Sequence, residues 1–296
     1  MRALAWDAGS GSLTVPTTMA RSMYEALEAN IAAFRMGATT MNTNSGEPMQ
    51  LPILSTHAVA TQVAGQGTTL AGSDPVFTRL QLDTFKYGQL VRVSNELLQD
   101  SAVDIAGMLG RDIGRALGRV IDTDLVVGSG SGKPRGVMTA AGAAGAGSVT
   151  TGGSLITPTY DTLINAIYAL NDSYRANGAV WLMRDSTAGT IRKLRDGAGG
   201  TVGAPLWEPS LTAGQPDTLF GYPVYTDPNV AAQGSNARVV AFLDPTAYYV
   251  RQVGNPVIEA DRSRYFDTDE TGYRGKWRVD GDLADLGAVS SIVQNV

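Results

Sequence analysis

A long amphipathic helix, predicted between Ser94 and Val127, constrains the fold of this chain more than any other segment. Its apolar residues recur every three or four positions, which keeps them on one side of a helix. These residues are Ile105, Leu109, Ile113, Ala116 and Val120. A second side carries arginines spaced four residues apart, namely Arg111, Arg115 and Arg119. Ser94 or Asn95 is expected to cap the helix, and a glycine-rich elbow at residues 128–138 follows it.

A third side of this helix has no side chains. It carries Gly107, Gly110, Gly114 and Gly118. A glycine inside a helix costs about 1 kcal/mol relative to alanine, so the four together cost about 3–4 kcal/mol. We expect another backbone, a strand or a loop, to lie close along the bare side and offset this cost. An ordinary core helix that tolerates its glycines remains the alternative.

Composition excludes several classes of function. The chain has 296 residues, enough for one elaborated domain or two. Its formal net charge of −5 does not support attraction to nucleic acid or to an anionic membrane. The absence of cysteine excludes disulfides and thiolate metal sites. No apolar run reaches the length of a membrane span, and the first residues lack the pattern of a secretory signal, so a cytoplasmic origin is expected.

Residues 46–76 differ from the rest of the chain. They alternate small, polar and β-branched residues without a helical period, and Gly65, Gly67 and Gly72 interrupt them. This pattern predicts a long two-stranded hairpin that is too poor in large side chains to form a core. Because an isolated hairpin is only marginally stable in water, it needs a partner surface, which we expect another subunit to supply. A disordered loop is the alternative.

The remaining segments alternate between helical and extended patterns. Helices are expected at 17–34, 157–176 and 185–195. Strands are expected at 76–93, 179–183, 218–226, 237–243, 247–253, 256–260, 272–280 and 287–293. Strands therefore gather before the long helix and again near the C-terminus, which is typical of an α+β fold.

The sequence offers little for catalysis. The elbow Gly128–Gly136 contains a GK pair, but Pro134 follows Lys133 and a helix precedes it, so it is not a phosphate-binding loop. His57 is the one histidine, and no nucleophile motif surrounds it. The acidic segment at 266–271 lacks the spacing of a calcium loop. We predict no catalytic, cofactor-binding or metal-binding residues.

Seven stretches, in this order, resemble the major capsid proteins of tailed phages, which have the Hong Kong 97 fold. They are GSGSLTVP (9–16), VRVSNELLQDS (91–101), GSGSGKPRGVM (128–138), AVWLM (179–183), LRDG (194–197), LFGYPVY (219–225) and VVAFLDPTAYYV (239–250). The elbow is similar to the family pattern G-x-G-x-x-x-P-x-G-[IV]-[LM]. The resemblance covers nearly the whole chain.

The resemblance implies an α+β fold with four parts. Residues 1–41 would be an N-terminal arm (N-arm), and residues 42–82 an extended loop (E-loop) lying over a neighbouring subunit. Residues 83–130 and 239–280 would form a peripheral domain containing the long spine helix. Residues 131–238 and 281–296 would form an axial domain. Pentamers and hexamers of the subunit would then tile an icosahedral shell around packaged double-stranded DNA.

Two features depart from the family pattern. Many members carry an N-terminal scaffolding segment that a phage protease removes; this chain begins at the arm, so we expect that segment to be cleaved or scaffolding to come from another protein. Some members join subunits by an isopeptide bond from a lysine of the E-loop. Residues 42–82 contain no lysine, and Lys86 lies beyond them, so we predict no such crosslink.

Apolar positions of the E-loop and charged positions of the spine helix and the 262–274 region are the candidate intersubunit contacts. They are Leu51, Ile53, Leu54, Val59, Val63, Arg111, Arg115, Arg119, Arg262, Arg264, Asp267 and Glu270. Further expected partners are scaffolding, portal and cement proteins, together with DNA bound without sequence specificity, and no membrane. The protein is expected in the virion capsid, assembled in the host cytoplasm.

Two alternatives remain at this point. An encapsulin-type compartment would use the same fold to enclose enzymes instead of DNA. A carboxylate-based enzyme would be a stable, active monomer.

Overall fold

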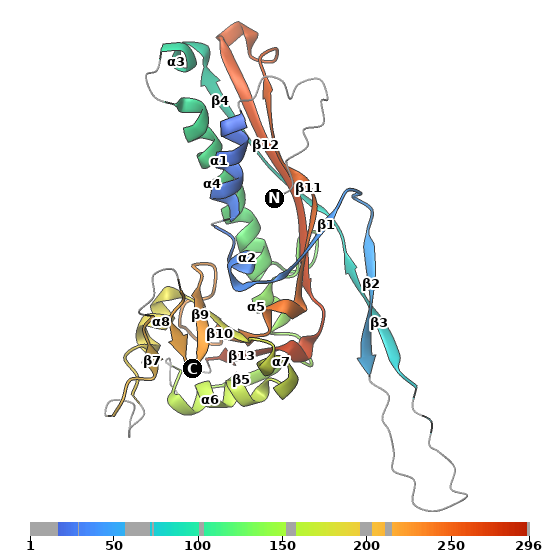
Figure 1. Ribbon diagram of the computed structural model, residues 1–296, viewed down its shortest axis with the longest axis vertical. Helices are drawn as coiled ribbons and strands as arrows, with labels where there is room; N and C mark the ends of the chain where they lie inside the picture. The colour runs from blue at the N-terminus through green and yellow to red at the C-terminus, as the bar shows by residue number, and fades with distance from the viewer. Residues whose placement is uncertain are drawn as a thin grey trace, which may run out of the picture.

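The computed structural model describes residues 17–28, 30–56, 72, 74–100, 104–151, 158–195, 203–210 and 215–294. Two β-sheets with helices on them form the body, and a two-stranded hairpin projects away from it (Figure 1). The predicted mixed α+β character is confirmed. Among the described residues, none of the helices combines the length and the apolar character needed to cross a bilayer.

A four-stranded sheet forms the upper half of the body in Figure 1. It consists of β1 (Thr39–Thr43), β4 (Phe85–Ser94), β11 (Tyr248–Asp261) and β12 (Glu270–Leu283). The strand order is β1-β11-β12-β4; β12 runs antiparallel to both neighbours, and β1 runs parallel to β11. The long β11–β12 ribbon ends in a tip that contains the short 3₁₀ turn η4 (Phe266–Thr268).

The predicted long helix is two helices, α3 (Asn95–Asp100) and α4 (Ile105–Val127). Asp104 stops a continuous helix, because its backbone is not helical and its carboxylate accepts the Gly107 N–H at 2.9 Å. The buried stripe of α4 consists of Ile113, Leu117, Ile121 and Leu125. The prediction that Val120 belongs to this stripe is wrong, since its side chain is 54% exposed.

The glycine side of α4 lies against helix α1 (Thr17–Glu28). A Cβ added at Gly110 would lie 2.5 Å from the Met19 carbonyl oxygen, and one added at Gly114 would overlap the Met23 carbonyl oxygen. The close backbone was therefore predicted correctly, but it belongs to a helix and not to a strand or loop. Four side chains of the N-terminal segment are fully buried here, Met19, Met23, Leu27 and Ile31. The short helix α2 (Ala32–Met36) follows, so the single helix predicted at 17–34 is two.

A seven-stranded sheet forms the lower half. Its strands are β5 (Gly147–Thr150), β6 (Val180–Met183), β7 (Trp207–Glu208), β8 (Thr218–Leu219), β9 (Tyr222–Thr226), β10 (Arg238–Leu243) and β13 (Val289–Val293). The order is β5-β13-β10-β6-β9-β8-β7. The predicted boundary placed residues 239–243 in the same domain as residues 83–130, but these residues form β10, which pairs with β6 and β13 inside this second sheet.

Four helices accompany the second sheet. They are α5 (Val137–Ala140), α6 (Tyr160–Ala169), α7 (Asp172–Ala176) and α8 (Asp185–Ile191). The predicted helix 157–176 therefore divides into α6 and α7; its predicted start lies partly outside the described residues, and Thr159 caps α6. Two further 3₁₀ turns, η3 (Pro245–Ala247) and η5 (Leu286–Ala288), end at strands β11 and β13.

The projecting hairpin consists of β2 (Met49–Thr56) and β3 (Val76–Leu82), which pair with each other and with no other strand of the described residues (Figure 1). The part of the predicted hairpin that contains His57, Val59 and Val63 lies outside the described residues.

Candidate functional site

The root of the hairpin is held by two buried charged residues on facing positions of β11 and β12. The guanidinium of Arg251 is buried and donates to the carbonyl oxygens of Leu82 at 2.8 Å and Ser45 at 2.9 Å. Asp280, opposite it in the register, accepts the Asp83 N–H at 2.5 Å. Burial raises the pKa of Asp280 to about 6. The base of the hairpin is therefore held to the four-stranded sheet by these hydrogen bonds, although the hairpin pairs with no other strand of the described chain.

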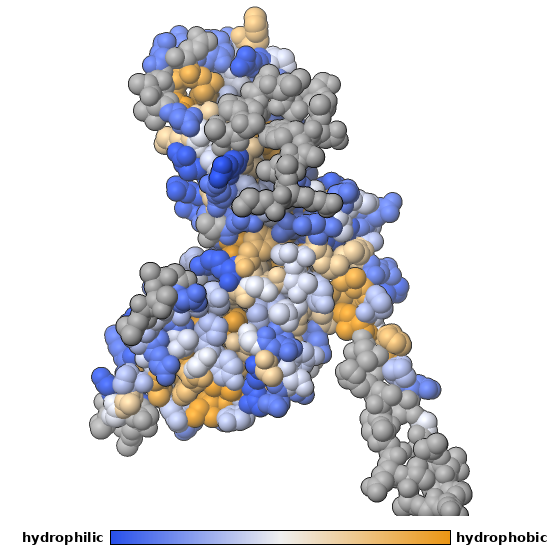
Figure 2. Space-filling model, viewed as in Figure 1, coloured by the Kyte–Doolittle hydropathy of each residue, from blue (hydrophilic) through white to orange (hydrophobic). Residues whose placement is uncertain are grey.

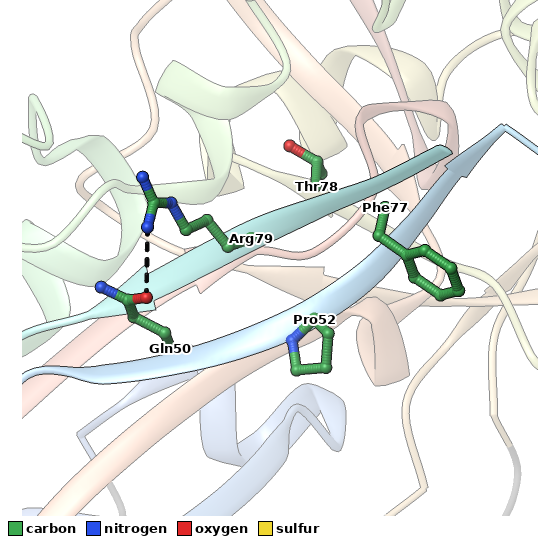
Figure 3. Close-up of a pocket in the computed structure, with 5 residues that line it drawn as sticks. All are labelled: Gln50, Pro52, Phe77, Thr78 and Arg79. Carbon is green, nitrogen blue, oxygen red and sulfur yellow. Dashed lines mark hydrogen bonds between the residues drawn. The ribbon is translucent and has the colours of Figure 1, made fainter. Parts of the chain in front are cut away.

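One face of the hairpin presents apolar surface to solvent. Phe77 is 68% exposed, and it lines a pocket of about 440 Å³ together with Gln50, Pro52, Thr78 and Arg79 (Figure 3). Arg79 donates to Gln50 across the strands at 3.4 Å. Apolar colour also gathers where the hairpin joins the body (Figure 2). An exposed aromatic ring beside a pocket is typical of a surface that binds a partner.

The predicted apolar contacts of the hairpin have different positions. Leu51 and Ile53 lie on β2 and are partly buried, opposite Leu80 and Thr78. The backbone of Leu54 pairs with Phe77. These three residues stay candidates for contacts between subunits.

The three arginines of α4 are all exposed, and among the described residues no ion pair is found for Arg111, Arg115 or Arg119. Since consecutive members of this row are four residues apart, they follow one side of the helix. They are therefore available to a partner.

The tip of the β11–β12 ribbon brings the other predicted charges together. Arg262, Arg264 and Asp267 are exposed there, whereas Glu270 is half-buried and pairs with Arg92 at 3.4 Å. The guanidinium groups of Arg92 and Arg264 lie 5.4 and 5.6 Å from the ring centre of Tyr265. At the end of the tip, the ring of Phe266 is 87% exposed.

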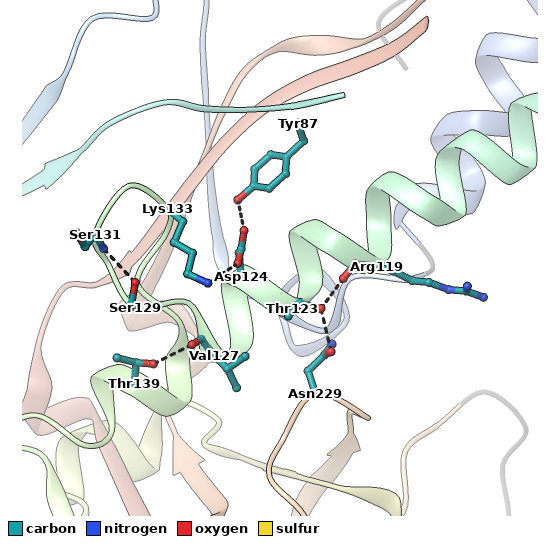
Figure 4. A network of polar contacts seen from close by, with 10 residues as sticks. All are labelled: Tyr87, Arg119, Thr123, Asp124, Val127, Ser129, Ser131, Lys133, Thr139 and Asn229. Atoms are coloured by element: carbon teal, nitrogen blue, oxygen red, sulfur yellow. Dashed lines mark hydrogen bonds and ion pairs between the residues drawn. The ribbon is translucent and has the colours of Figure 1, made fainter. Parts of the chain in front are cut away.

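The elbow after α4 is a structural turn. Lys133 forms an ion pair with Asp124 of α4 at 3.2 Å, and Asp124 also accepts the Tyr87 hydroxyl at 2.9 Å (Figure 4). Burial and the Asp124 carboxylate raise the pKa of Tyr87. Gly130 and Gly132 have φ of 77° and 68°, which glycine adopts easily. The lysine of this glycine-rich motif thus ties the elbow to the helix.

Two exposed aromatic residues, Phe77 and Phe266, were missed from sequence. Phe77 lies in the expected strand 76–93, where aromatic residues are usually buried, so hydropathy alone does not separate it from core residues. Phe266 lies in the charge-rich segment between two expected strands. The sequence RSRYFDTDE (262–270) around Phe266 carries a weak signal, because an aromatic residue between so many charges has few apolar neighbours to bury it. Within the described residues no group of three or more His, Cys, Asp or Glu side chains is placed to hold a metal.

Comparison with solved structures finds the same fold in other proteins. The fold is similar to the capsid of a native GTA particle, with a TM-score of 0.77 and 24% identity over 99% of this chain and 96% of that chain. It is also similar to structures from Mycobacterium phage Cain (TM-score 0.67, 17% identity, 90% of each chain) and Microbacterium phage Oxtober96 (TM-score 0.66, 17% identity, 90% and 91%). A search of curated protein sequences found no match.

The model of the phage capsid family matches residues 11–293, nearly the whole sequence. The chain belongs to the phage capsid family, and the Hong Kong 97 fold predicted from its motifs agrees with its structural neighbours. Family and fold both point to a structural protein.

Proposed function

We propose that this protein is the major capsid subunit of a tailed phage, assembling as pentamers and hexamers into an icosahedral shell around double-stranded DNA. The observation that carries the proposal is the projecting β2–β3 hairpin, which exposes Phe77 on a chain of the phage capsid family. A hairpin with no strand partner of its own gains stability when a neighbouring copy covers its apolar face.

In this proposal residues 1–41 are the N-arm and residues 42–82 the E-loop. The four-stranded sheet with α4 belongs to the peripheral domain, and the seven-stranded sheet to the axial domain. Each contact is weak, and assembly sums many of them over a closed shell. Apolar burial contributes about 25 cal/mol per Å², and charged groups at α4 and at the β11–β12 tip set the register between subunits.

The proposed location is the virion capsid, after assembly in the host cytoplasm. Scaffolding, portal and cement proteins are the expected partners. The net charge of −5 fits a container that holds DNA without sequence-specific binding.

Electron microscopy of the purified full-length protein tests the proposal. Closed or partly closed shells are the expected result, and particles from infected cells are expected to absorb as nucleic acid. Particles filled with protein cargo and no DNA would favour the encapsulin alternative. A stable monomer that never assembles under any condition tried, with an enzymatic activity, would reject the proposal.

Charge reversal at the candidate contacts is expected to disturb assembly. Arg115→Glu on α4 and Arg264→Glu at the tip should give soluble capsomers or aberrant shells, because each puts a like charge where a partner's carboxylate would bind. Arg115→Lys and Arg264→Lys keep the charge and serve as matched controls. Particle yield after sedimentation is the measurement; normal yields from both reversals would remove these residues from the interface.

We expect no covalent crosslink between subunits, so denaturation should separate them. Since residues 42–82 contain no lysine, boiled particles should run on a denaturing gel as one band near 31.0 kDa. A ladder of multiples that survives boiling would contradict this prediction. Particle stability then comes from non-covalent contacts alone.

A further inference from the structure

A buried pair of carboxyl groups lies where three parts of the chain meet. Asp122 is on α4, and Asp227 directly follows β9; their side chains are 3% and 1% exposed. Asp122 accepts the Ala32 N–H of α2 at 2.7 Å through Oδ1 and the Asn229 side-chain amide at 2.8 Å through Oδ2. Asp227 Oδ1 accepts the Asn229 N–H at 2.6 Å. The pair therefore connects the N-terminal segment and α4 with the loop between β9 and β10.

The two carboxyl groups face each other without a donor between them. Asp227 Oδ2 is buried and receives no hydrogen bond from the described residues, although the Asp122 carboxyl lies within hydrogen-bonding reach of Asp227. Two ionised carboxylates within hydrogen-bonding reach of each other repel strongly in a buried site. A single proton placed between them removes the repulsion and supplies the missing donor.

A cavity of about 410 Å³ reaches the pair and gives water a route to it. Arg35 of α2 and Arg119 of α4 also line this cavity, and they are the other charged residues that face the pair within the described chain. Burial and Asp227 raise the pKa of Asp122 to about 7, while the Ala32 N–H and Arg35 lower it in part. The two guanidinium groups make a bound metal cation unfavourable here, so a proton is the better occupant.

We propose that Asp122 and Asp227 share one proton and act as a pH-sensitive latch that holds α2, α4 and the β9–β10 loop together. Thr123 extends the latch, because its hydroxyl donates to the Asn229 side-chain oxygen at 2.9 Å (Figure 4). Arg35 adds a weaker contact to the Thr226 carbonyl oxygen at 3.3 Å. The latch joins the two sheets of the body and does not depend on which shell the subunit forms.

The sign of the pH dependence follows from linkage. In an open junction Asp122 is solvated, and its pKa returns toward the ordinary value of 3.8. Between that pH and about 7 the closed junction holds a proton that the open junction lacks, so closure weakens as the pH rises through this window. One shared proton changes the closed-to-open ratio by up to about tenfold per pH unit. The latch is thus firm in mild acid and loose in mild alkali.

Hydrogen exchange on the soluble full-length protein tests the latch, because the Ala32 and Asn229 amides donate to the two carboxyl groups. Protection factors corrected for intrinsic rate should fall by about tenfold or more in peptides covering these amides between about pH 5.5 and about pH 8.5. Asp227→Asn supplies a permanent donor in the same shape, so protection in this variant should not change over that range. Asp112→Asn, an exposed change on the same helix, should keep the wild-type profile.

Three outcomes overturn the proposal. They are protection that is independent of pH in the wild type, an unchanged slope in Asp227→Asn, and recovery at high pH on adding calcium ions in place of acid. If Asp227→Asn does not fold, the carboxyl carbon of Asp122 in the wild type can be titrated by NMR. A midpoint near 7 supports the latch, and a midpoint near the ordinary 3.8 overturns it.

Discussion

Gly114→Ala should lower the free energy of unfolding by about 1–3 kcal/mol, as expected for an overpacked core site. A Cβ at this position would overlap the Met23 carbonyl oxygen and lie 3.0 Å from its carbonyl carbon. The backbone of α1 must then move away from α4, which loosens the buried side chains of Met19, Met23 and Leu27. Helix propensity alone predicts the opposite sign, a gain of about 1 kcal/mol.

Gly189→Ala provides the matched control. Gly189 lies in helix α8, and no atom lies within 4 Å of the Cβ that alanine would add. This change should therefore raise the free energy of unfolding by about 0.5–1 kcal/mol. Denaturant unfolding of the soluble subunit, followed by the fluorescence of the buried Trp277 and other tryptophans, measures both variants. A Gly114→Ala protein as stable as Gly189→Ala would mean that α1 does not pack on the glycine face in solution.

The two repeats that meet in this contact could each be recognised from sequence. Met19, Met23, Leu27 and Ile31 recur every four residues, and so do Gly110, Gly114 and Gly118. Their pairing could not be predicted, because about ninety residues separate them and local periodicity carries no information about distant partners. The break at Asp104 was missed for a different reason. An aspartate near a helix start fits either the first turn or the N-cap, and the backbone angle decides between them.

The placement of strand 238–243 shows a second limit. Its run of buried residues fits a central strand of either sheet, so composition does not decide between them. Sheet membership depends on β6 and β13, which come from segments about fifty residues away on either side. Asp122 and Asp227 are a similar case, since each is unremarkable in its own segment and only the fold makes them neighbours.

Phe77→Asp should abolish shell assembly while leaving the subunit folded. The Phe77 ring is 68% exposed in the isolated chain, so its removal costs the subunit within about 0.5 kcal/mol of stability. Covering the ring at an interface is worth about 1.5–3 kcal/mol per subunit. Because about 1.4 kcal/mol is a factor of ten, loss of this contact should raise the subunit concentration needed for assembly by about tenfold to a hundredfold. The buried charge would add to this loss.

Phe77→Ala separates the effect of the ring from that of the charge, because it removes the exposed ring and adds no charge. Light scattering against protein concentration measures assembly, and thermal unfolding measures the subunit. If Phe77 is an anchor, both variants raise the subunit concentration needed for assembly, and Phe77→Asp raises it more. Normal assembly of Phe77→Ala with loss in Phe77→Asp would mean that the charge, and not the missing ring, prevents assembly, and normal assembly of Phe77→Asp would show that this face stays in solvent. The root formed by Arg251 and Asp280 holds the hairpin direction in either variant, so a change in assembly reports on the exposed face and not on the position of the hairpin.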